Sequence, residues 1–205
     1  MELDRTLRQV RSVSSAFETR ADDDGMHIEG YFAVFNTNYE IFPGVTESVA
    51  PEAFSKTLGG DIKALCDHDT RLVLGRNKAN TLELRVDTHG LWGRIDINPN
   101  DTDAVNLWNR VKRGDVDQCS FGFEIVDEET EYREDGSIHF TIREVKLYEV
   151  SVVTFPAYAE TSVSARKRDV DEIRKRKLDA WRVTALARLK GENHGTESSD
   201  AAQKD

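Results

Sequence analysis

The feature that most constrains the fold is a succession of short apolar segments separated by turn residues. Five such segments, each four to ten residues long, occupy positions 27–36, 63–68, 72–75, 81–87 and 91–97. Segments of this length, with alternating apolar and polar positions and turn residues between them, are typical of β-strands. The regular alternation of strand and helix that a doubly wound α/β fold needs is missing. The pattern therefore predicts a mainly β fold, a barrel or a sandwich with a few helices attached.

The second half of the chain adds two longer apolar segments. Residues 119–126 predict a strand that places Phe121 and Phe123 on one face and Ser120 on the other. Residues 138–155 predict one long strand or a strand pair bent twice. The Asp-Gly pair between the two segments predicts a hairpin turn.

Three segments carry helix signals. Residues 101–114 begin with acidic side chains, end with basic ones and stop at Gly114, which suits the helix dipole and supplies a C-terminal cap. Pro51 predicts the first turn of a short helix, where its missing N–H costs nothing. Apolar residues recur at helical spacing from 165 to 190. We expect residues 191–205 to be disordered because they are predominantly polar.

Charge divides the chain at the same place. The net charge is −10, yet residues 165–190 are basic, so the acidic charge is concentrated in residues 1–164. We therefore expect a domain over 1–164, a basic helix over 165–190 and a polar tail over 191–205. An acidic body argues against a reader of nucleic acid, which needs a basic face, and suits a protein that meets basic peptide segments.

Cysteine use and hydropathy indicate a reducing compartment and no membrane span. The two cysteines, Cys66 and Cys119, form no Cys-x-x-Cys pair and cannot make a zinc site by themselves. We expect both to be reduced thiols. The N-terminus carries charges throughout and lacks the apolar stretch of a signal peptide. No apolar run approaches the roughly 18 residues of a membrane span, so we expect a soluble cytoplasmic protein.

His68 stands between two carboxylates in the stretch Cys-Asp-His-Asp-Thr. It is either a polar residue of a surface turn or a general base oriented by neighbouring charge. The strand histidines His27 and His139 occupy alternating stretches, and we expect them at the surface. No His-x-x-x-His or His-Glu-x-x-His pair exists, so a metalloprotease would have no ligands.

Ser120 and Glu149 are the other candidates for chemistry. Ser120 lies in Gln-Cys-Ser-Phe-Gly-Phe, which lacks the Gly-x-Ser-x-Gly elbow of the α/β-hydrolases. A serine nucleophile needs a base within hydrogen-bond reach, because its hydroxyl barely ionises at neutral pH. Glu149 lies inside an otherwise apolar strand, where burying a carboxylate is costly without a partner. It either partners a histidine cation or points to solvent at a sheet edge.

Seven stretches of the chain match one known family in order. They are Gly-Tyr-Phe-Ala-Val-Phe-Asn (30–36), Glu-Ser-Val-Ala-Pro-Glu-Ala-Phe (47–54), Ala-Leu-Cys-Asp-His-Asp (64–69), Leu-Gly (74–75), Gly-Leu-Trp (90–92), Ser-Phe-Gly-Phe (120–123) and Glu-Val-Ser-Val-Val-Thr-Phe-Pro-Ala-Tyr (149–158). Each stretch is weak alone, but seven in order across about 130 residues are specific. In these stretches the chain resembles the prohead serine proteases of tailed bacteriophages, which are similar to the herpesvirus assemblins.

The resemblance implies a role for each candidate residue. The histidine of the Asp-His-Asp stretch, His68, is the general base, and the serine before Phe-Gly-Phe, Ser120, is the nucleophile. The assemblins have a histidine as third member in His-Val-Ala-Leu-Cys; the matching stretch here is Glu-Val-Ser-Val-Val, which puts Glu149 in that place. A carboxylate there orients the imidazole and stabilises its cation. Asp67 and Asp69 are the alternatives for this third member. Neither a metal nor a cofactor is implied.

The resemblance also implies a fold and a biological role. The fold is a herpesvirus-protease-like closed β-barrel surrounded by helices, with the C-terminal helix in addition. The role is to enter the prohead in the host cytoplasm, remove the scaffold-like segment of the major capsid protein and cut itself, with 165–205 as a packaging or self-cleavage segment. The assemblin relatives work as dimers, so a homodimer is compatible with the resemblance, and no nucleic-acid or membrane partner is implied. The alternative is a non-catalytic scaffold or assembly protein of the prohead with the same fold.

Overall fold

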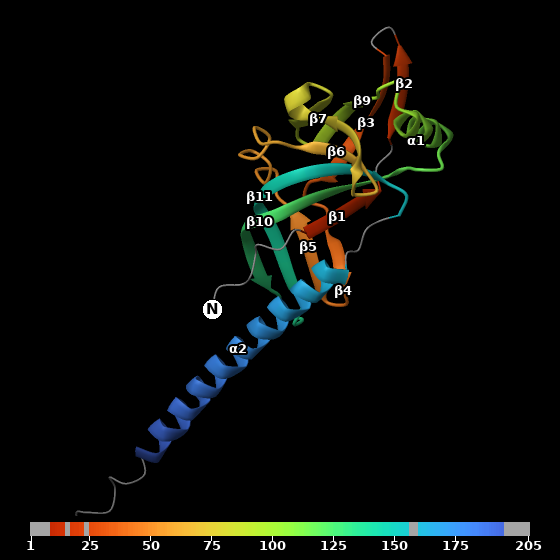
Figure 1. Ribbon diagram of the computed structural model, residues 1–205. Helices are drawn as coiled ribbons and strands as arrows, with labels where there is room; N and C mark the ends of the chain where they lie inside the picture. Colours follow the sequence, from red (N-terminus) through yellow and green to blue (C-terminus); the bar gives the residue numbers. More distant parts are fainter. Residues whose placement is uncertain (1–8, 15–16, 23–24, 156–159, 195–205) are drawn as a thin grey trace, which may run out of the picture. The chain divides into compact units, whose positions relative to one another are not determined.

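The chain divides into two compact units, residues 1–163 and residues 164–205. A computed structural model describes residues 9–14, 17–22, 25–155 and 160–194 (Figure 1). The described part of the first unit is mostly β-strand with one long helix, α1 (Thr102–Arg113), and the second unit holds most of the helix α2 (Glu160–His194). The predicted mainly β fold with helices is therefore confirmed.

Two sheets make up the described part of the first unit. In the larger sheet the strand order is β1-β10-β11-β5-β4, and β6 pairs with β11 and with β7. The smaller sheet has the order β2-β3-β9-β8. The strands are β1 (Gln9–Ser14), β2 (Glu18–Asp22), β3 (Gly25–Val34), β4 (Tyr39–Phe42), β5 (Val45–Val49), β6 (Lys63–Cys66), β7 (Asp69–Arg76), β8 (Leu82–Val86), β9 (Gly90–Asp96), β10 (Gln118–Tyr132) and β11 (Ile138–Val153). Among the described residues these pairings leave two open sheets, so they do not form the closed barrel that the resemblance implies.

The longest strand pair is the antiparallel hairpin of β10 and β11, which lie side by side in Figure 1. β11 is one continuous strand of 16 residues, which settles the choice between a long strand and a bent pair. The hairpin turn predicted at Asp135-Gly136 is confirmed, and Gly136 has the positive φ of 84° that glycine tolerates. A register shift between Gly122 and Phe123 lets β10 bend without losing its pairing.

The short helix predicted at Pro51 is wrong, because successive tight turns replace it. The N–H groups of Ala53 and Ser55 donate to the carbonyl oxygens of Ala50 and Glu52, three residues earlier, at 3.0 Å each. Bonds of this span close separate turns and do not extend into the i to i−4 ladder of an α-helix.

α1 has the ends that the sequence predicts. The Asp101 carboxylate accepts hydrogen bonds from the backbone N–H groups of Asp103 and Ala104, and Gly114 closes the helix with φ of 83°. The indole nitrogen of Trp108 donates to the carbonyl oxygen of His27 at 3.1 Å. This bond fixes the helix against β3, beside the apolar core.

The core lies on one face of β10 and β11. The rings of Phe121 and Phe123 stack at 4.8 Å between centroids, and Val150 and Val152 of β11 are fully buried beside them in the same cluster. Because successive strand residues point to opposite faces, Ser120 lies on the face away from this cluster, as predicted. The polar candidates of β10 and β11 therefore share a face that the core does not occupy.

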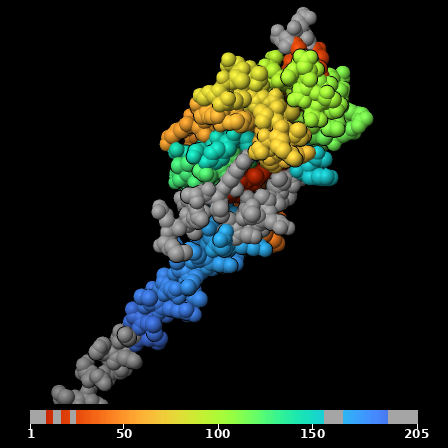
Figure 2. Space-filling view, in the orientation of Figure 1, coloured from red at the N-terminus to blue at the C-terminus, as the bar shows by residue number. Residues whose placement is uncertain are grey.

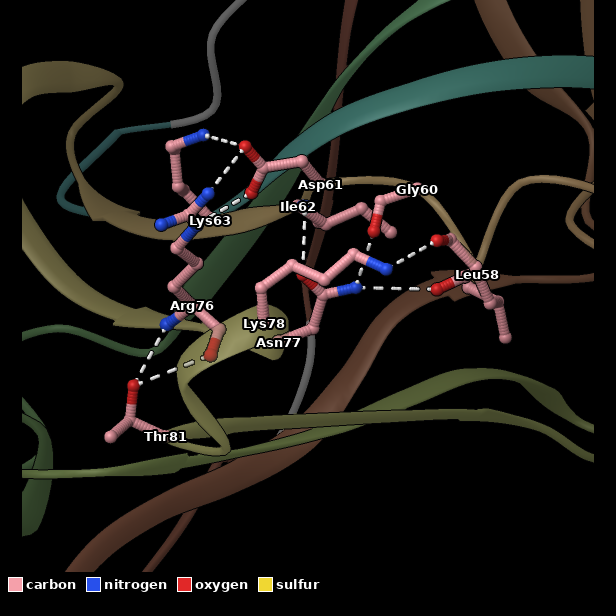
Figure 3. Close-up of polar contacts among 10 residues, drawn as sticks. Leu58, Gly60, Asp61, Ile62, Lys63, Arg76, Asn77, Lys78 and Thr81 are labelled. Atoms are coloured by element: carbon pink, nitrogen blue, oxygen red, sulfur yellow. Dashed lines mark hydrogen bonds and ion pairs between the residues drawn. The ribbon is translucent and has the colours of Figure 1, made fainter.

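A network of hydrogen bonds fixes the ends of the β6–β7 hairpin, which carries His68 at its turn (Figure 3). The side chain of Asn77, in the short 3₁₀ helix η1 (Asn77–Ala79), accepts from the N–H of Ile62 at 2.9 Å and donates to the carbonyl of Gly60 at 2.8 Å. Arg76 donates to Asp61 at 2.7 Å, which holds the pKa of that carboxyl well below its usual range. The base of the hairpin is thus held before its turn is formed.

α2 is longer than the helix predicted over 165–190, since it runs from Glu160 to His194. Residues 195–205, which were expected to be disordered, lie outside the described residues. Of the helices described, none is long and apolar enough to cross a membrane.

Candidate active site

His68 occupies a tight turn between β6 and β7 with unusual backbone angles. Asp67 and His68 have φ of 49° and 60°, the left-handed region that non-glycine residues rarely adopt. Asp67 holds this turn: its Oδ1 accepts from the N–H of Thr154 at 2.7 Å, its Oδ2 accepts from the Thr154 hydroxyl at 3.0 Å, and its own N–H donates to Val152 at 3.0 Å. The turn is therefore fastened to the C-terminal end of β11.

The partner of His68 is Glu149. β6 and β11 pair in parallel, so the turn after β6 comes close to the carboxylate. Glu149 is 2% exposed, and its Oε1 accepts from His68 Nδ1 at 2.7 Å. Its Oε2 accepts from the Ser151 hydroxyl at 2.6 Å. Of the two interpretations left open for this residue, the structure shows the histidine partner and excludes the solvent-facing charge.

This contact determines which nitrogen of His68 carries the proton. An ionised carboxylate only accepts hydrogen bonds, so Nδ1 is the donor, and Nε2 of the neutral ring presents a lone pair. Nε2 is buried and has no hydrogen-bond partner among the described residues. A buried acceptor without a partner is costly unless it serves a purpose, and here it is available to take a proton.

Ser120 lies next to this pair on the same sheet face. It stands directly opposite Ser151 across β10 and β11, and Ser151 is two residues from Glu149. Opposite residues of an antiparallel pair have Cβ atoms about 5 Å apart and point to the same side. The structure thus brings the three predicted site residues to one place, although the Ser120 hydroxyl donates to the carbonyl oxygen of Arg11 at 2.9 Å and not to His68.

β1 covers the serine. It pairs with the free edge of β10 with Ser12 opposite Ser120, and Ser120 is fully buried. The Arg11 side chain forms an ion pair with the buried carboxylate of Glu47 and donates to Gln9 at 2.8 Å. A peptide that is to reach Ser120 has to displace this strand.

The alternatives to Glu149 are engaged elsewhere. Both oxygens of Asp67 accept from Thr154, as described above. Asp69 accepts from Arg71 at 2.7 Å, and this hydrogen bond lowers the pKa of Asp69 to about 2. Neither contact leads toward the imidazole of His68. The geometry therefore favours Glu149 as the residue that orients the ring.

The two cysteines are free thiols and do not compete with Ser120 as nucleophile. Cys119 is buried on the core side, where it donates to the carbonyl of Tyr31 at 2.8 Å. Burial raises the pKa of the Cys66 thiol, which keeps it in the protonated, weakly nucleophilic form at neutral pH.

The expectation that His27 and His139 lie at the surface is wrong, because they are 2% and 7% exposed. His139 bridges β11 and β5: its Nδ1 and Nε2 are 2.7 Å and 2.9 Å from the hydroxyls of Thr46 and Ser48. Hydroxyls flanking a strand position opposite a histidine are the only sequence signal for this contact, and the pairing of β5 with β11 is needed to see it.

This bridge predicts a pH-dependent stability. Burial is the main cause that lowers the pKa of His139, so the unfolded chain takes up the proton at about pH 6.5 and the folded chain only at lower pH. The contribution is fully present above that pH and is lost as the pH falls below it. His139→Gln should therefore lose less Tm than wild type between about pH 7.5 and about pH 5.5. A variant of the exposed His89 is the control, and equal losses in all three would contradict the expectation.

No group of three or more His, Cys, Asp or Glu side chains is placed to hold a metal ion in the described ranges. What the site does contain is a buried carboxylate that holds an imidazole, with a serine on the neighbouring strand. These are the side chains that a serine hydrolase requires. The comparison with protein families points the same way: the chain belongs to the caudovirus prohead serine protease family, whose model matches residues 15–176.

Individual relatives are more distant. The chain is 28% identical over 158 residues to the prohead protease of Enterobacteria phage HK97, which covers 75% of this chain and 65% of that protein. The chain thus spans about two thirds of the length of this relative. The solved structure of the bacteriophage T4 capsid assembly protease has a TM-score of 0.49 and 11% identity, covering 73% of this chain and 98% of that one. At this score the similarity carries no argument about the site.

Proposed function

We propose that the chain is a serine endopeptidase of phage capsid maturation, with Ser120 as nucleophile, His68 as general base and Glu149 as the residue that orients the base. The observation that carries this proposal is the bond from His68 Nδ1 to the buried carboxylate of Glu149, which leaves Nε2 unpartnered. Membership of the prohead protease family supports the same reading. The proposed substrates are the scaffold-like segment of the major capsid protein, inside the prohead, and the chain itself.

The reaction follows from the placement of the protons. The Ser120 hydroxyl turns from the carbonyl of Arg11 to His68 Nε2, which takes its proton as the oxygen attacks a peptide carbonyl. Glu149 stabilises the imidazolium through Nδ1. His68 then gives the proton to the leaving amine, which departs and leaves an acyl-enzyme. Water, deprotonated by the same nitrogen, releases the acid and restores the serine.

Access to Ser120 predicts an effect of β1. Glu47→Gln keeps the shape of the side chain that binds Arg11 but removes its charge, so β1 should leave β10 more often. Labelling of Ser120 by a fluorophosphonate should then be several-fold faster than in wild type. Glu83→Gln, at an exposed position of β8, is the matched control. Equal labelling rates for the two variants would show that β1 does not limit access.

The decisive experiment is co-expression with the phage's own major capsid protein, read by intact mass, for wild type and His68→Ala. A capsid protein shortened only with wild type supports the protease and gives the cleavage site. Shortening with both would assign the cut to another enzyme. No shortening with either, when particles have formed, would contradict the proposal.

The second candidate is a non-catalytic scaffold or assembly protein of the prohead. The complete burial of Ser120 beneath β1 is the observation that favours it. In that case the co-expression would give particles that depend on the chain but contain a full-length capsid protein, and His68→Ala would assemble them equally well.

A further inference from the structure

Taken by itself, α2 exposes a narrow apolar stripe along its C-terminal half. Leu178, Trp181 and Leu189 are 47%, 67% and 59% exposed, and Ala185 lies between the last two. The spacings are three, four and four residues, which places these side chains on one face of a helix over about 16 Å. The surface of this helix is drawn in blue in Figure 2. Large apolar side chains gathered on one exposed face indicate an interaction surface.

Basic residues line both borders of this stripe. Residues 174–190 hold seven basic side chains and one acidic one, Asp179. At about 100° per residue, Lys175 and Arg182 lie beside Leu178, and Lys177 and Arg188 lie beside Trp181. Asp179 lies away from the stripe and is 3.3 Å from Arg182. The surface is therefore an apolar seam between two basic borders.

These borders restrict what can cover the seam. A second copy of α2 would bring basic borders against basic borders, and such like-charge pairing is unfavourable. A membrane surface suits a wide apolar face, whereas this seam covers only about 80° of the helix, close to the width that one packed helix covers. A partner helix with its own apolar seam and acidic borders satisfies both the width and the charge.

We propose that the stripe formed by Leu178, Trp181, Ala185 and Leu189 is a docking seam for an acidic amphipathic helix of a partner protein. Trp181 supplies the largest apolar contact, as aromatic residues do at the centre of interfaces. The basic borders fix the charge of the partner and speed its approach. This interaction does not depend on hydrolysis, so it stands or falls separately from the proposed protease activity.

The test uses the full chain carrying Ser120→Ala, so that no peptide is consumed. Two labelled peptides of about four heptads, with leucine at the seam and either glutamate or lysine at its borders, are titrated and read by fluorescence anisotropy. We expect the glutamate peptide to bind about tenfold or more tightly than the lysine peptide. Trp181→Ala should weaken that binding about tenfold or more, while Val183→Ala, exposed but off the seam, should leave it unchanged.

A charge reversal gives the sharper result. Changing Lys175, Arg182 and Arg188 together to glutamate should exchange the preference, so that the lysine peptide binds better. Far-UV circular dichroism checks that each variant keeps its helix. Equal binding of the two peptides, or an equal effect of Trp181→Ala and Val183→Ala, would overturn the proposal. So would a Trp181-dependent binding to phosphatidylserine vesicles, or a Trp181-dependent self-association, in the absence of peptide binding.

Discussion

Ser120→Ala is expected to abolish cleavage of the capsid protein while the chain stays folded. The change removes one oxygen, whose bond to the Arg11 carbonyl contributes about 1 kcal/mol to stability. Without the hydroxyl no acyl-enzyme forms, and the loss of a serine nucleophile lowers the rate by about 10⁴-fold or more in enzymes of this kind. The effect on activity thus far exceeds the effect on the fold.

Intact mass of the co-expressed capsid protein measures this effect, and thermal unfolding of the purified variant checks the fold. Ser55→Ala is the matched control, because Ser55 is exposed and its hydroxyl also donates to a backbone carbonyl, at 2.8 Å. The control should cleave like wild type. If Ser120→Ala still shortens the capsid protein, another nucleophile carries the reaction.

Glu149→Gln is expected to have the second largest effect. An amide keeps the size of the side chain, but its NH₂ group can donate to His68 Nδ1, which moves the ring proton to Nε2. The base then has no lone pair facing the serine, and its cation loses its counter-charge. The corresponding change in the chymotrypsin triad lowers kcat by about 10⁴-fold, and we expect a loss of that order.

Cleavage rates of Glu149→Gln are to be compared with those of Asp69→Asn. Asp69 binds Arg71 in solvent, so its variant should cleave nearly as fast as wild type. A loss in Asp69→Asn as large as that in Glu149→Gln would make Asp69 the third member. Raising the pH should not rescue Glu149→Gln, because its defect lies in which nitrogen carries the proton rather than in how much of the base is charged.

Local patterns in the sequence were enough for much of the secondary structure. Alternation and turn residues predict β3, β6 to β9 and the hairpin of β10 and β11, and the charged ends with Gly114 predict α1. They fail after Pro51, because a favourable first residue does not show whether hydrogen bonds will continue beyond a turn. The three candidate site residues were also recognised from the sequence, through the order of their motifs, and their catalytic roles remain proposals.

The sequence by itself determined which residues alternate between two faces, where turns occur and which side chains are able to do chemistry. Only the tertiary structure decided which strands are neighbours: that β6 lies beside β11, so that His68 binds Glu149, that β1 covers Ser120, and that His139 is buried against β5. The physical reason is that a period of two specifies a strand's faces but not its partner. Partners are chosen by the shared burial of side chains far apart in the chain, such as Glu47 with Arg11.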